Sequence, residues 1–218
     1  MSRRTADHES PLHTDRSHVK RGPNRADYER DRVDQILDAS LFCTVAQSIE
    51  GQPFATPTCH WRDEDYLYWH GHAKARNLAP GQPVCINVTQ FDGLVLARSA
   101  FHHSVNYRSV TLFGQAEAVT DPDEKARQLE RFVDKIAPGR WPQLRPMNGP
   151  ELKGTGVSRI RITEASCKVR ADGVNDDAED VDWPVWAGVV PLQRQWGTRE
   201  QEREQPVGLT PPDPVELW

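Results

Sequence analysis

No stretch of this sequence is apolar for long enough to cross a bilayer, which takes about 20 consecutive apolar residues. The first residues, Met-Ser-Arg-Arg-Thr-Ala-Asp-His, also lack the apolar segment of a secretory signal. We therefore expect a cytoplasmic protein with no membrane partner. The net charge of -5 and the pI near 5.9 leave no excess of positive charge. This argues against nucleic acid as a partner, because binding phosphates along a nucleic acid needs a basic surface.

Cysteine is scarce: Cys43, Cys59, Cys85 and Cys167 lie far apart and form no paired-thiol motif. Their positions predict reduced structural thiols and not disulfides or zinc ligands. Apolar residues are also few, at 37% with a mean hydropathy of -0.72. For 218 residues, we expect one domain with a real core, and part of the chain loose or packed on a partner.

Composition divides the chain into three regions. Residues 1–25 are polar and carry no periodicity, which predicts a flexible N-terminal arm. Residues 26–192 contain the alternating apolar segments of one folded domain. Residues 193–218 are charged and rich in proline, which predicts an irregular C-terminal tail.

The fold class follows from the order of the predicted elements. Helices are predicted over 27–39, over 122–137 and, in a short form, over 73–80. Strands are predicted over 41–49, 53–62, 66–69, 84–91, 94–97, 110–119 and 157–162. Glu50-Gly51, Asp63–Asp65 and Asp92-Gly93 are predicted as tight turns. Short turns between successive strands are typical of antiparallel sheets, so we expect a mainly β (α+β) fold, a barrel of six or seven antiparallel strands with flanking helices.

The segment from Asp65 to Leu78 contains the predicted binding site. Its first part is a strand, Gly71 allows a sharp turn, and a helix is predicted to begin near Ala73. Lys74 and Arg76 would then lie in or next to the first helical turn, where free amides and the helix dipole favour an anion. This arrangement predicts a phosphate site, although an ordinary strand-to-helix turn with solvated charges would show the same residues.

Four segments resemble a known family when they are taken in order and at their intervals. They are Lys20–Arg25, Tyr68–Gly71 with Arg76, Ser104–Val110 running into Phe113-Gly114, and Glu151–Lys153 followed by Val157. The chain resembles the pyridoxamine 5'-phosphate oxidase-like FMN-binding split-barrel flavoproteins, and within them the branch that contains the nitroimidazole-resistance proteins. The resemblance implies a split β-barrel over residues 26–192 and a homodimer that binds FMN in two sites at the subunit interface.

The same resemblance implies which residues contact the cofactor. Arg76 matches a phosphate-binding arginine of the branch, with Lys74 beside it. The other implied contacts are Thr56, Pro57, Thr58, Tyr68, His70, Gly71, Ala73, Asn77, Asn106, Tyr107, Arg108 and Ser109. Asn106 to Ser109 would approach either from the same subunit or across the interface. Asn77 stands where a second basic residue is common, and the substrate-binding set of true pyridoxamine phosphate oxidases is not recognisable, so we do not expect vitamin B6 oxidation.

His70 is the candidate catalytic residue. A neutral imidazole near the flavin could deliver a proton, because its unperturbed pKa is about 6.5, and the matching histidine of the nitroimidazole-resistance branch lies at the active site. Alternatively, His70 only forms a hydrogen bond with the turn at Gly71. The remaining histidines His60, His72, His102 and His103 have no carboxylate or thiolate at a ligand spacing, so we predict no metal site and keep haem as a minor alternative to FMN.

Together these observations predict an FMN-binding oxidoreductase. It would pass electrons from a reduced nicotinamide cofactor, NAD(P)H, to a small molecule, with nitroaromatics among the candidates. The alternative is a flavin- or haem-binding protein that serves storage, sensing or regulation without turnover. Trp183 and Trp186 would either cover the flavin or attach the C-terminal segment to the barrel, and we expect the latter.

Overall fold

The computed structural model describes residues 11–200, 202 and 208. Residues 1–10 of the predicted arm and most of the predicted C-terminal tail lie outside this range. The helices are α1 (Arg30–Asp38), α2 (Pro122–Ile136) and α3 (Gly149–Gly154). The strands are β1 (Ala26–Asp27), β2 (Phe42–Ile49), β3 (Gln52–Asp63), β4 (Tyr66–His72), β5 (Pro83–Leu96), β6 (Ser104–Gln115), β7 (Glu117–Ala118), β8 (Thr155–Arg161), β9 (Ala165–Arg170) and β10 (Gly188–Pro191).

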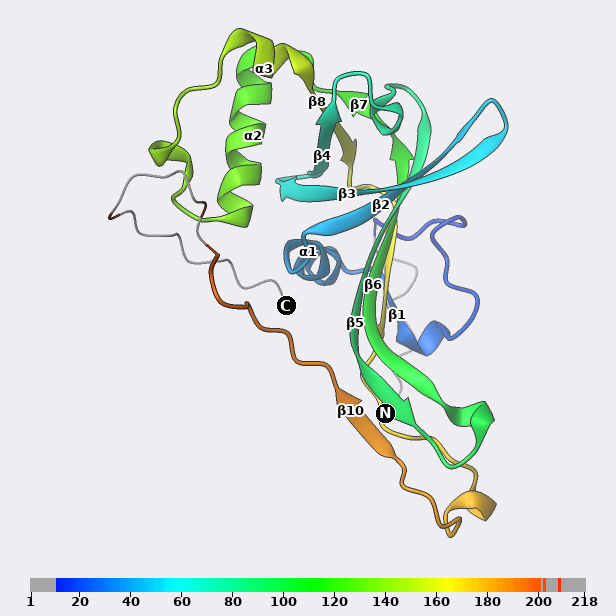
Figure 1. The fold of residues 1–218 in the computed structure, drawn as a ribbon. Coiled ribbons are helices and arrows are strands. Elements are labelled where there is room, and N and C mark those ends of the chain that lie inside the picture. The colour runs from blue at the N-terminus through cyan, green and yellow to red at the C-terminus, as the bar shows by residue number, and fades with distance from the viewer. Residues whose placement is uncertain (1–10, 201, 203–207, 209–218) are drawn as a thin grey trace.

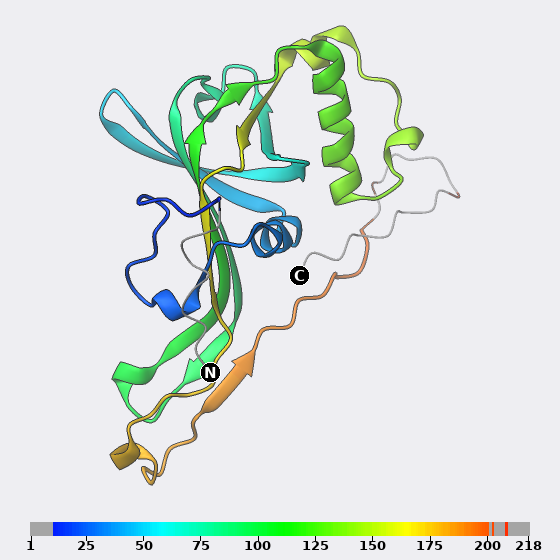
Figure 2. The same cartoon turned by 180° about the vertical axis from the view of Figure 1, so that it is seen from behind.

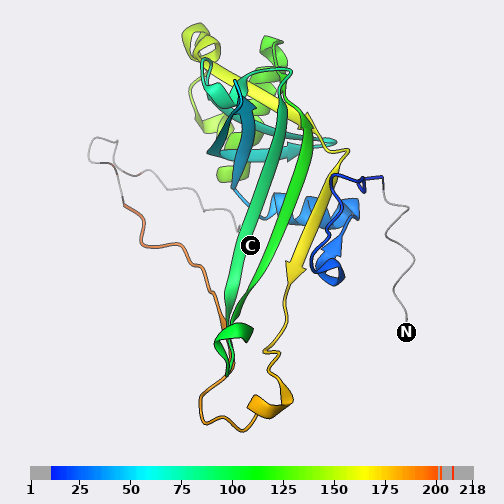
Figure 3. The same ribbon diagram turned by 90° about the vertical axis from the view of Figure 1, so that its right-hand side faces the viewer.

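All of these strands belong to one antiparallel sheet that curls into a split β-barrel, as predicted (Figure 1). The strand order is β1-β9-β6-β5-β2-β3-β4-β8-β7, and β10 pairs with the far half of β5. β5 and β6 are longer than their neighbours and extend out of the barrel as an arm, which β10 joins at its tip (Figure 3). The strand count exceeds the predicted six or seven, because β1, β9 and β10 were not predicted and the predicted strand 110–119 is divided between β6 and β7.

The core lies between the inner face of the sheet and α1. Val33, Ile36 and Leu37 form the apolar stripe of α1 and are buried against the strands. Val45, Ile86 and Val110 extend this cluster across β2, β5 and β6. Alternate residues of each strand therefore point inward, as the period of two along a strand requires.

α2 covers the outer face of β3 and β4 (Figure 2). It begins as predicted: Asp121 Oδ1 accepts a hydrogen bond from the Glu124 amide at 2.7 Å, and Pro122 occupies the first turn. Leu129 and Phe132 of α2 pack in a second apolar cluster. This helix fixes the surroundings of the β4 side chains that point outward.

Residues 11–25 pack on the barrel and are not the flexible arm that composition suggested. Leu12 is 3% exposed and belongs to the core. Its carbonyl accepts a hydrogen bond from the Ala165 amide at 3.0 Å, and Arg16 forms an ion pair with Glu164. The polar composition of this segment reflects contacts along one edge of the sheet, where only single apolar side chains are buried.

Two predicted local structures are wrong. Asp92-Gly93 does not form a hairpin: β5 continues to Leu96, and the register with β6 shifts at a β-bulge between Phe91 and Gly93. No α-helix covers 73–80, where the chain forms only the 3₁₀ turn Arg76–Leu78. No helix of the described residues is long and apolar enough to cross a membrane.

Candidate functional site

The bend between β4 and β5 is held tightly against β8. Gly71 and Gly156 are cross-strand partners, and a Cβ on Gly156 would lie 2.6 Å from Leu78 Cδ1 and 3.2 Å from Ala73 Cα. The Ala73 amide donates a hydrogen bond to Gly154 O at 2.8 Å. Trp69 Nε1 donates to Asn77 O at 2.9 Å. The bend is thus fixed by close approach of two backbones, which only glycine at position 156 allows.

Lys74 and Arg76 project from this bend and are exposed. They face a cavity of about 510 Å³, which Ile49, Glu50, Ala75, Leu78, Pro80 and Gln82 also line. Neither cation forms an ion pair with any described residue, although most arginines elsewhere in the chain do. The two cations therefore lie together on one cavity wall without an ion pair to a described residue, which makes this wall a candidate anion site, and Glu50 is the acidic residue that lines the same cavity.

Residues from the β2–β3 hairpin position Arg76. Its guanidinium lies over the Phe54 ring, 4.4 Å from the centroid. Gln47 Nε2 donates a hydrogen bond to Arg76 O at 2.8 Å, while Gln47 Oε1 is buried without a hydrogen-bond partner among the described residues. No sequence pattern points to Phe54 or Gln47, because their proximity to Arg76 depends on the barrel and not on spacing.

The anion site does not use a helix N-terminus, contrary to the prediction. The Ala73 and Ala75 amides donate to Gly154 O and His72 O, so they are already occupied. The three-residue turn Arg76–Leu78 is too short to present a helix dipole. Anion affinity at the bend therefore depends on the side chains of Lys74 and Arg76.

Thr56, Pro57 and Thr58 lie on β3, one strand from the bend. Thr56 and Thr58 are half-buried and share the inward face with Val45 and Cys43, whereas Pro57 is exposed on the other face. Thr58 Oγ1 donates a hydrogen bond to His70 O at 3.2 Å. The structure therefore brings this strand segment next to His70.

The His70 side chain points under α2. Its ring centroid lies 4.3 Å from that of Phe132 and 5.8 Å from that of Trp61, and its Nδ1 is buried without a hydrogen-bond partner among the described residues. Burial lowers the pKa of His70 below its ordinary value. The imidazole is therefore neutral near pH 7. Tyr68 lies on the same side, 4% exposed, stacked on Trp61 at 5.7 Å.

The last four predicted site residues, Asn106 to Ser109, lie elsewhere in the chain. They belong to β6, four strands from β4 in the sheet order, which at about 4.8 Å per strand is roughly 19 Å along the sheet. Their side chains are engaged there. Asn106 Oδ1 accepts from Arg170, and Arg108 forms a double hydrogen bond with Asp92 at 2.8 and 2.9 Å. One chain therefore does not bring the two predicted groups together.

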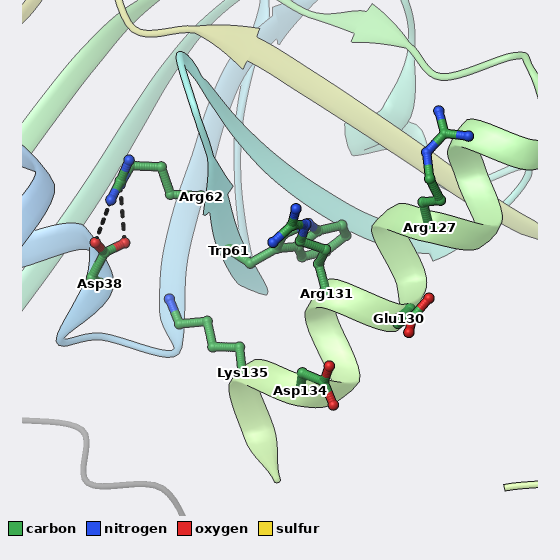
Figure 4. Close-up of a pocket in the computed structure, with 8 residues that line it drawn as sticks. All are labelled: Asp38, Trp61, Arg62, Arg127, Glu130, Arg131, Asp134 and Lys135. Atoms are coloured by element: carbon green, nitrogen blue, oxygen red, sulfur yellow. Dashed lines mark hydrogen bonds and ion pairs between the residues drawn. The ribbon is translucent and has the colours of Figure 1, made fainter. Parts of the chain in front are cut away.

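A second cleft of about 510 Å³ lies between α2 and β3 (Figure 4). Trp61 lies at its base, Arg62 is paired with Asp38 at 2.6 Å on one side, and Arg131 and Lys135 extend from α2. Lys135 Nζ donates a hydrogen bond to Leu37 O at 3.1 Å and forms no ion pair within the described chain. Burial lowers its pKa to about 8. The apolar period of α2 alone gives no sign of a role for this lysine.

The histidines do not gather into a metal site. Across residues 11–200, no group of three or more histidine, cysteine, aspartate or glutamate residues is placed to hold a metal ion. All four cysteines are unpaired. His60 is fully buried, and burial lowers its pKa to about 3.

The comparison with protein families decides the identity. The family model described as Pyridoxamine 5'-phosphate oxidase matches residues 29–169. The chain belongs to the pyridoxamine 5'-phosphate oxidase family. A comparison with curated proteins found no match.

Solved structures agree with this family. The flavocytochrome Anf3 from Azotobacter vinelandii is 42% identical over 94% of this chain and 95% of its own, with a TM-score of 0.88. The FAD and haem binding protein from Mycobacterium smegmatis is 36% identical over 84% of this chain and 92% of its own, with a TM-score of 0.80. A protein named for a proposed role in 5-nitroimidazole antibiotic resistance, from Bacteroides thetaiotaomicron, is 20% identical over 66% and 86%, with a TM-score of 0.55, and shares the fold alone.

Proposed function

We propose that this chain binds a flavin nucleotide, FMN in the first place, with its phosphate at Lys74 and Arg76. The observation that carries the proposal is the pair of exposed cations, free of ion pairs in the described chain, on one wall of a cavity of about 510 Å³. Phe54 and Gln47 hold Arg76 in place from the neighbouring hairpin. The names of two relatives, a flavocytochrome and an FAD and haem binding protein, support a flavin at a site of this fold.

The residues around the bend fit such a group. Lys74 and Arg76 supply charge-assisted hydrogen bonds to a phosphate, and the edge of β3 at Thr56–Thr58, which pairs with β2 and not with β4, offers a place for a flat ring. A bound flavin supplies transfer of a hydride or of single electrons. FAD carries a pyrophosphate that the same two cations can bind, so both nucleotides belong in the test.

We further propose an oxidoreductase that passes electrons from a reduced nicotinamide cofactor to a small electron-poor molecule such as a nitroaromatic. His70 is the proposed proton donor: its ring is neutral near pH 7 and half-buried, so one ring nitrogen gives up its proton to the substrate while the other takes up a proton from solvent. Its backbone contact with Thr58 keeps it beside the proposed place of the flavin ring. Storage or sensing without turnover is the competing function.

The anion site is tested by comparing FMN with riboflavin, which lacks the phosphate. We expect the double variant K74A/R76A to weaken FMN roughly a hundredfold or more, since each charge-assisted hydrogen bond contributes about 1.5–3 kcal/mol. Riboflavin should bind almost unchanged. Fluorescence titration with FMN, FAD and riboflavin measures this, and R127A/K153A, which removes two exposed cations elsewhere, is the matched control. Equal losses for FMN and riboflavin would contradict a phosphate site at the bend.

The role of His70 is tested by turnover. We expect H70N to bind FMN as the parent does and to slow reduction of a nitroaromatic by about a hundredfold, the usual range for a lost proton donor. Stopped-flow absorbance separates flavin reduction by the nicotinamide from flavin reoxidation by the substrate. An unchanged reoxidation rate would leave His70 as a structural residue, and no turnover by the parent would favour storage or sensing.

Haem is a second candidate ligand, and one observation favours it. His70 Nδ1 is buried without a partner in the described chain, and the ring is neutral, which is the form that ligates haem iron. Two relatives above 30% identity are named for haem or cytochrome character. The visible spectrum of the purified protein distinguishes the two groups: a Soret band that disappears in H70A supports haem at this residue, and flavin bands alone argue against it.

We also propose that the working unit is a homodimer. The two groups of predicted flavin contacts lie roughly 19 Å apart along the sheet of one chain. A two-fold related copy can bring Asn106 to Ser109 of one subunit to the bend of the other.

A further inference from the structure

Residues 181–192, which include β10, carry an unusual amount of exposed apolar surface. We call this segment the strap. Trp183 and Trp186 are 65% and 63% exposed, contrary to the expectation that they attach this segment to the barrel. The strap also exposes Val181, Val185, Val189, Val190 and Leu192. The two tryptophans alone leave on the order of 200–300 Å² uncovered, so the whole strap reaches the size of patch that marks an interface, about 300–600 Å² on a typical monomer.

The strap is nevertheless held in one place. β10 pairs with Gly93–Leu96 of β5, and the Leu192 amide donates to Asp92 O at 2.9 Å. Upstream, Arg98 and Asp176 form an ion pair at 2.6 Å, in which the Asp176 side chain is 4% exposed. An apolar segment that is already ordered loses little conformational entropy when it docks.

The same chain contains a surface that the strap fits. A shallow groove of about 460 Å³ crosses β2, β3, β5 and β6 and is lined mainly by apolar side chains, among them Ala46, Phe54, Ala55, Cys85 and Phe113. Figures 1 and 2 show the β2–β3 hairpin and the strap on opposite sides of the molecule, so the strap does not cover its own groove. The groove adjoins the proposed phosphate site, because Phe54 and Gln47 line the groove and also contact Arg76.

We propose that two copies of this chain form a dimer in which the strap of each copy, still paired with its own β5, packs in the groove of the other copy. The strap then lies beside the bend at Lys74 and Arg76 of that copy. A two-fold dimer requires a donor surface and its complement on one chain, and the strap and the groove meet this requirement. Two symmetric straps double the apolar surface covered and approach the roughly 800 Å² per partner of a standard interface. The proposal extends the proposed homodimer by naming the segment that closes the flavin site from the partner, but this packing does not need the flavin.

Cross-linking tests the contact directly in the full-length protein without added flavin. Val185 is 48% exposed between the two tryptophans, and the native Cys85 lines the groove. We expect V185C to give a covalent dimer with a short bismaleimide on a denaturing gel, and V185C/C85S to give none. A cross-link within one chain, seen as a monomer in which the thiols at positions 85 and 185 have both reacted, would overturn the proposed packing of the strap on a second copy. So would the same dimer yield from both variants.

Sedimentation tests the energetic role of the strap. We expect W183S/W186S to raise the dimer dissociation constant by roughly thirtyfold or more, as expected when two aromatic anchors are lost, and the control I136S/L144S, which removes two exposed apolar side chains elsewhere, to leave it unchanged. A monomeric parent protein, or equal constants for both variants, would overturn the proposal. FMN titration is carried out separately. A protein whose dimer depends on the strap but which does not bind FMN would contradict the proposed flavin site and leave the proposed dimer contact supported.

Discussion

Lys135 illustrates how a single residue on a packing helix acquires chemistry from its surroundings. Its ammonium group lies near the C-terminal end of α1, where Leu37 O accepts hydrogen bonds from both Lys135 and His60. Burial is the main cause of its lowered pKa. The charge of Arg62 lowers the pKa further, whereas Asp38, Cys43 and Cys59 raise it. A lysine in this setting destabilises the fold whenever it is protonated.

We therefore expect K135M to stabilise the protein at pH 7. The folded pKa of about 8 lies below the ordinary 10.5, so between these values the unfolded chain binds more protons and stability rises with pH. The free-energy cost of burying the protonated Lys135 is fully present below about pH 8. The gain from K135M should reach roughly 3 kcal/mol there, from about 1.4 kcal/mol per pKa unit, less the lost hydrogen bond, and should shrink as the pH approaches 10.5.

Urea denaturation of parent and variant at pH 7 and pH 10 measures this difference. K125M is the matched control, because Lys125 also lies on α2 and also donates to a backbone carbonyl, Leu152 O at 3.4 Å. A gain that K125M shares, or one that does not shrink at high pH, would contradict the assignment of the cost to the buried ammonium group.

At the scale of elements, the bend that carries Lys74 and Arg76 owes its shape to β8. Gly156 lets the Ala73 backbone approach within van der Waals distance, and the buried Leu78 side chain occupies the space of a Cβ at position 156. A methyl group there forces the bend away from the sheet, and such overpacking costs about 1–3 kcal/mol.

We expect G156A to weaken FMN binding about tenfold while the protein stays folded, because the shifted bend moves Arg76 away from Phe54 and Gln47. Isothermal titration gives the affinity, and circular dichroism shows that the fold is retained. G154A is the control, since a Cβ at position 154 meets nothing within 4 Å. If both variants bind FMN as the parent does, the bend does not depend on this close approach.

The elements that were predicted correctly are those whose signals are local. The Asp121-Pro122 start of α2 and the alternation in β2 and β3 depend on neighbouring residues, and the structure has both. Asp92-Gly93 misled because the same pair suits a tight turn and a β-bulge, and only the length of β6 opposite decides between them. β9 was not predicted, although its sequence alternates apolar and polar residues as a strand with one buried face does.

The residues of the candidate site fall into the same two groups, those with a local signal in the sequence and those without one. Lys74 and Arg76 were predicted because strand, glycine and cations follow one another along the chain, and His70 was predicted because the family resemblance implies a histidine at the active site. Phe54, Gln47 and Gly156 reach the bend only through the curvature of the barrel, so no spacing identifies them. The helix expected at Ala73 was wrong because the Ala73 amide donates to Gly154 O on the neighbouring segment and the Ala75 amide donates to His72 O in a local turn, so the amides that would have begun the helix are taken up.

At the scale of the whole molecule, the proposed flavin site is divided between two places on one chain. The bend lies at one end of the barrel, and Asn106 to Ser109 lie on the arm, four strands away. An arm built from β5, β6 and β10 extends from the barrel, and the strap that runs along it leaves Trp183 and Trp186 exposed. In the proposed homodimer, a second copy covers these exposed apolar residues and receives Asn106 to Ser109 at its own bend.

Dimers that combine two different variant subunits test whether the flavin site is divided between subunits. We expect both K74A/R76A and R108A homodimers to bind FMN weakly, because each damages one half of every site; R108A should fold, since its partly exposed pair with Asp92 contributes little stability. After subunit exchange, half of the dimers are hybrids in which one site is intact and the other is doubly damaged, so about one quarter of all sites should regain parental affinity. Flavin fluorescence of the mixture, compared with each unmixed variant, measures the recovery. Because complementation needs residues from two chains in one site, a mixture that binds no better than its components would place the complete flavin site within a single subunit.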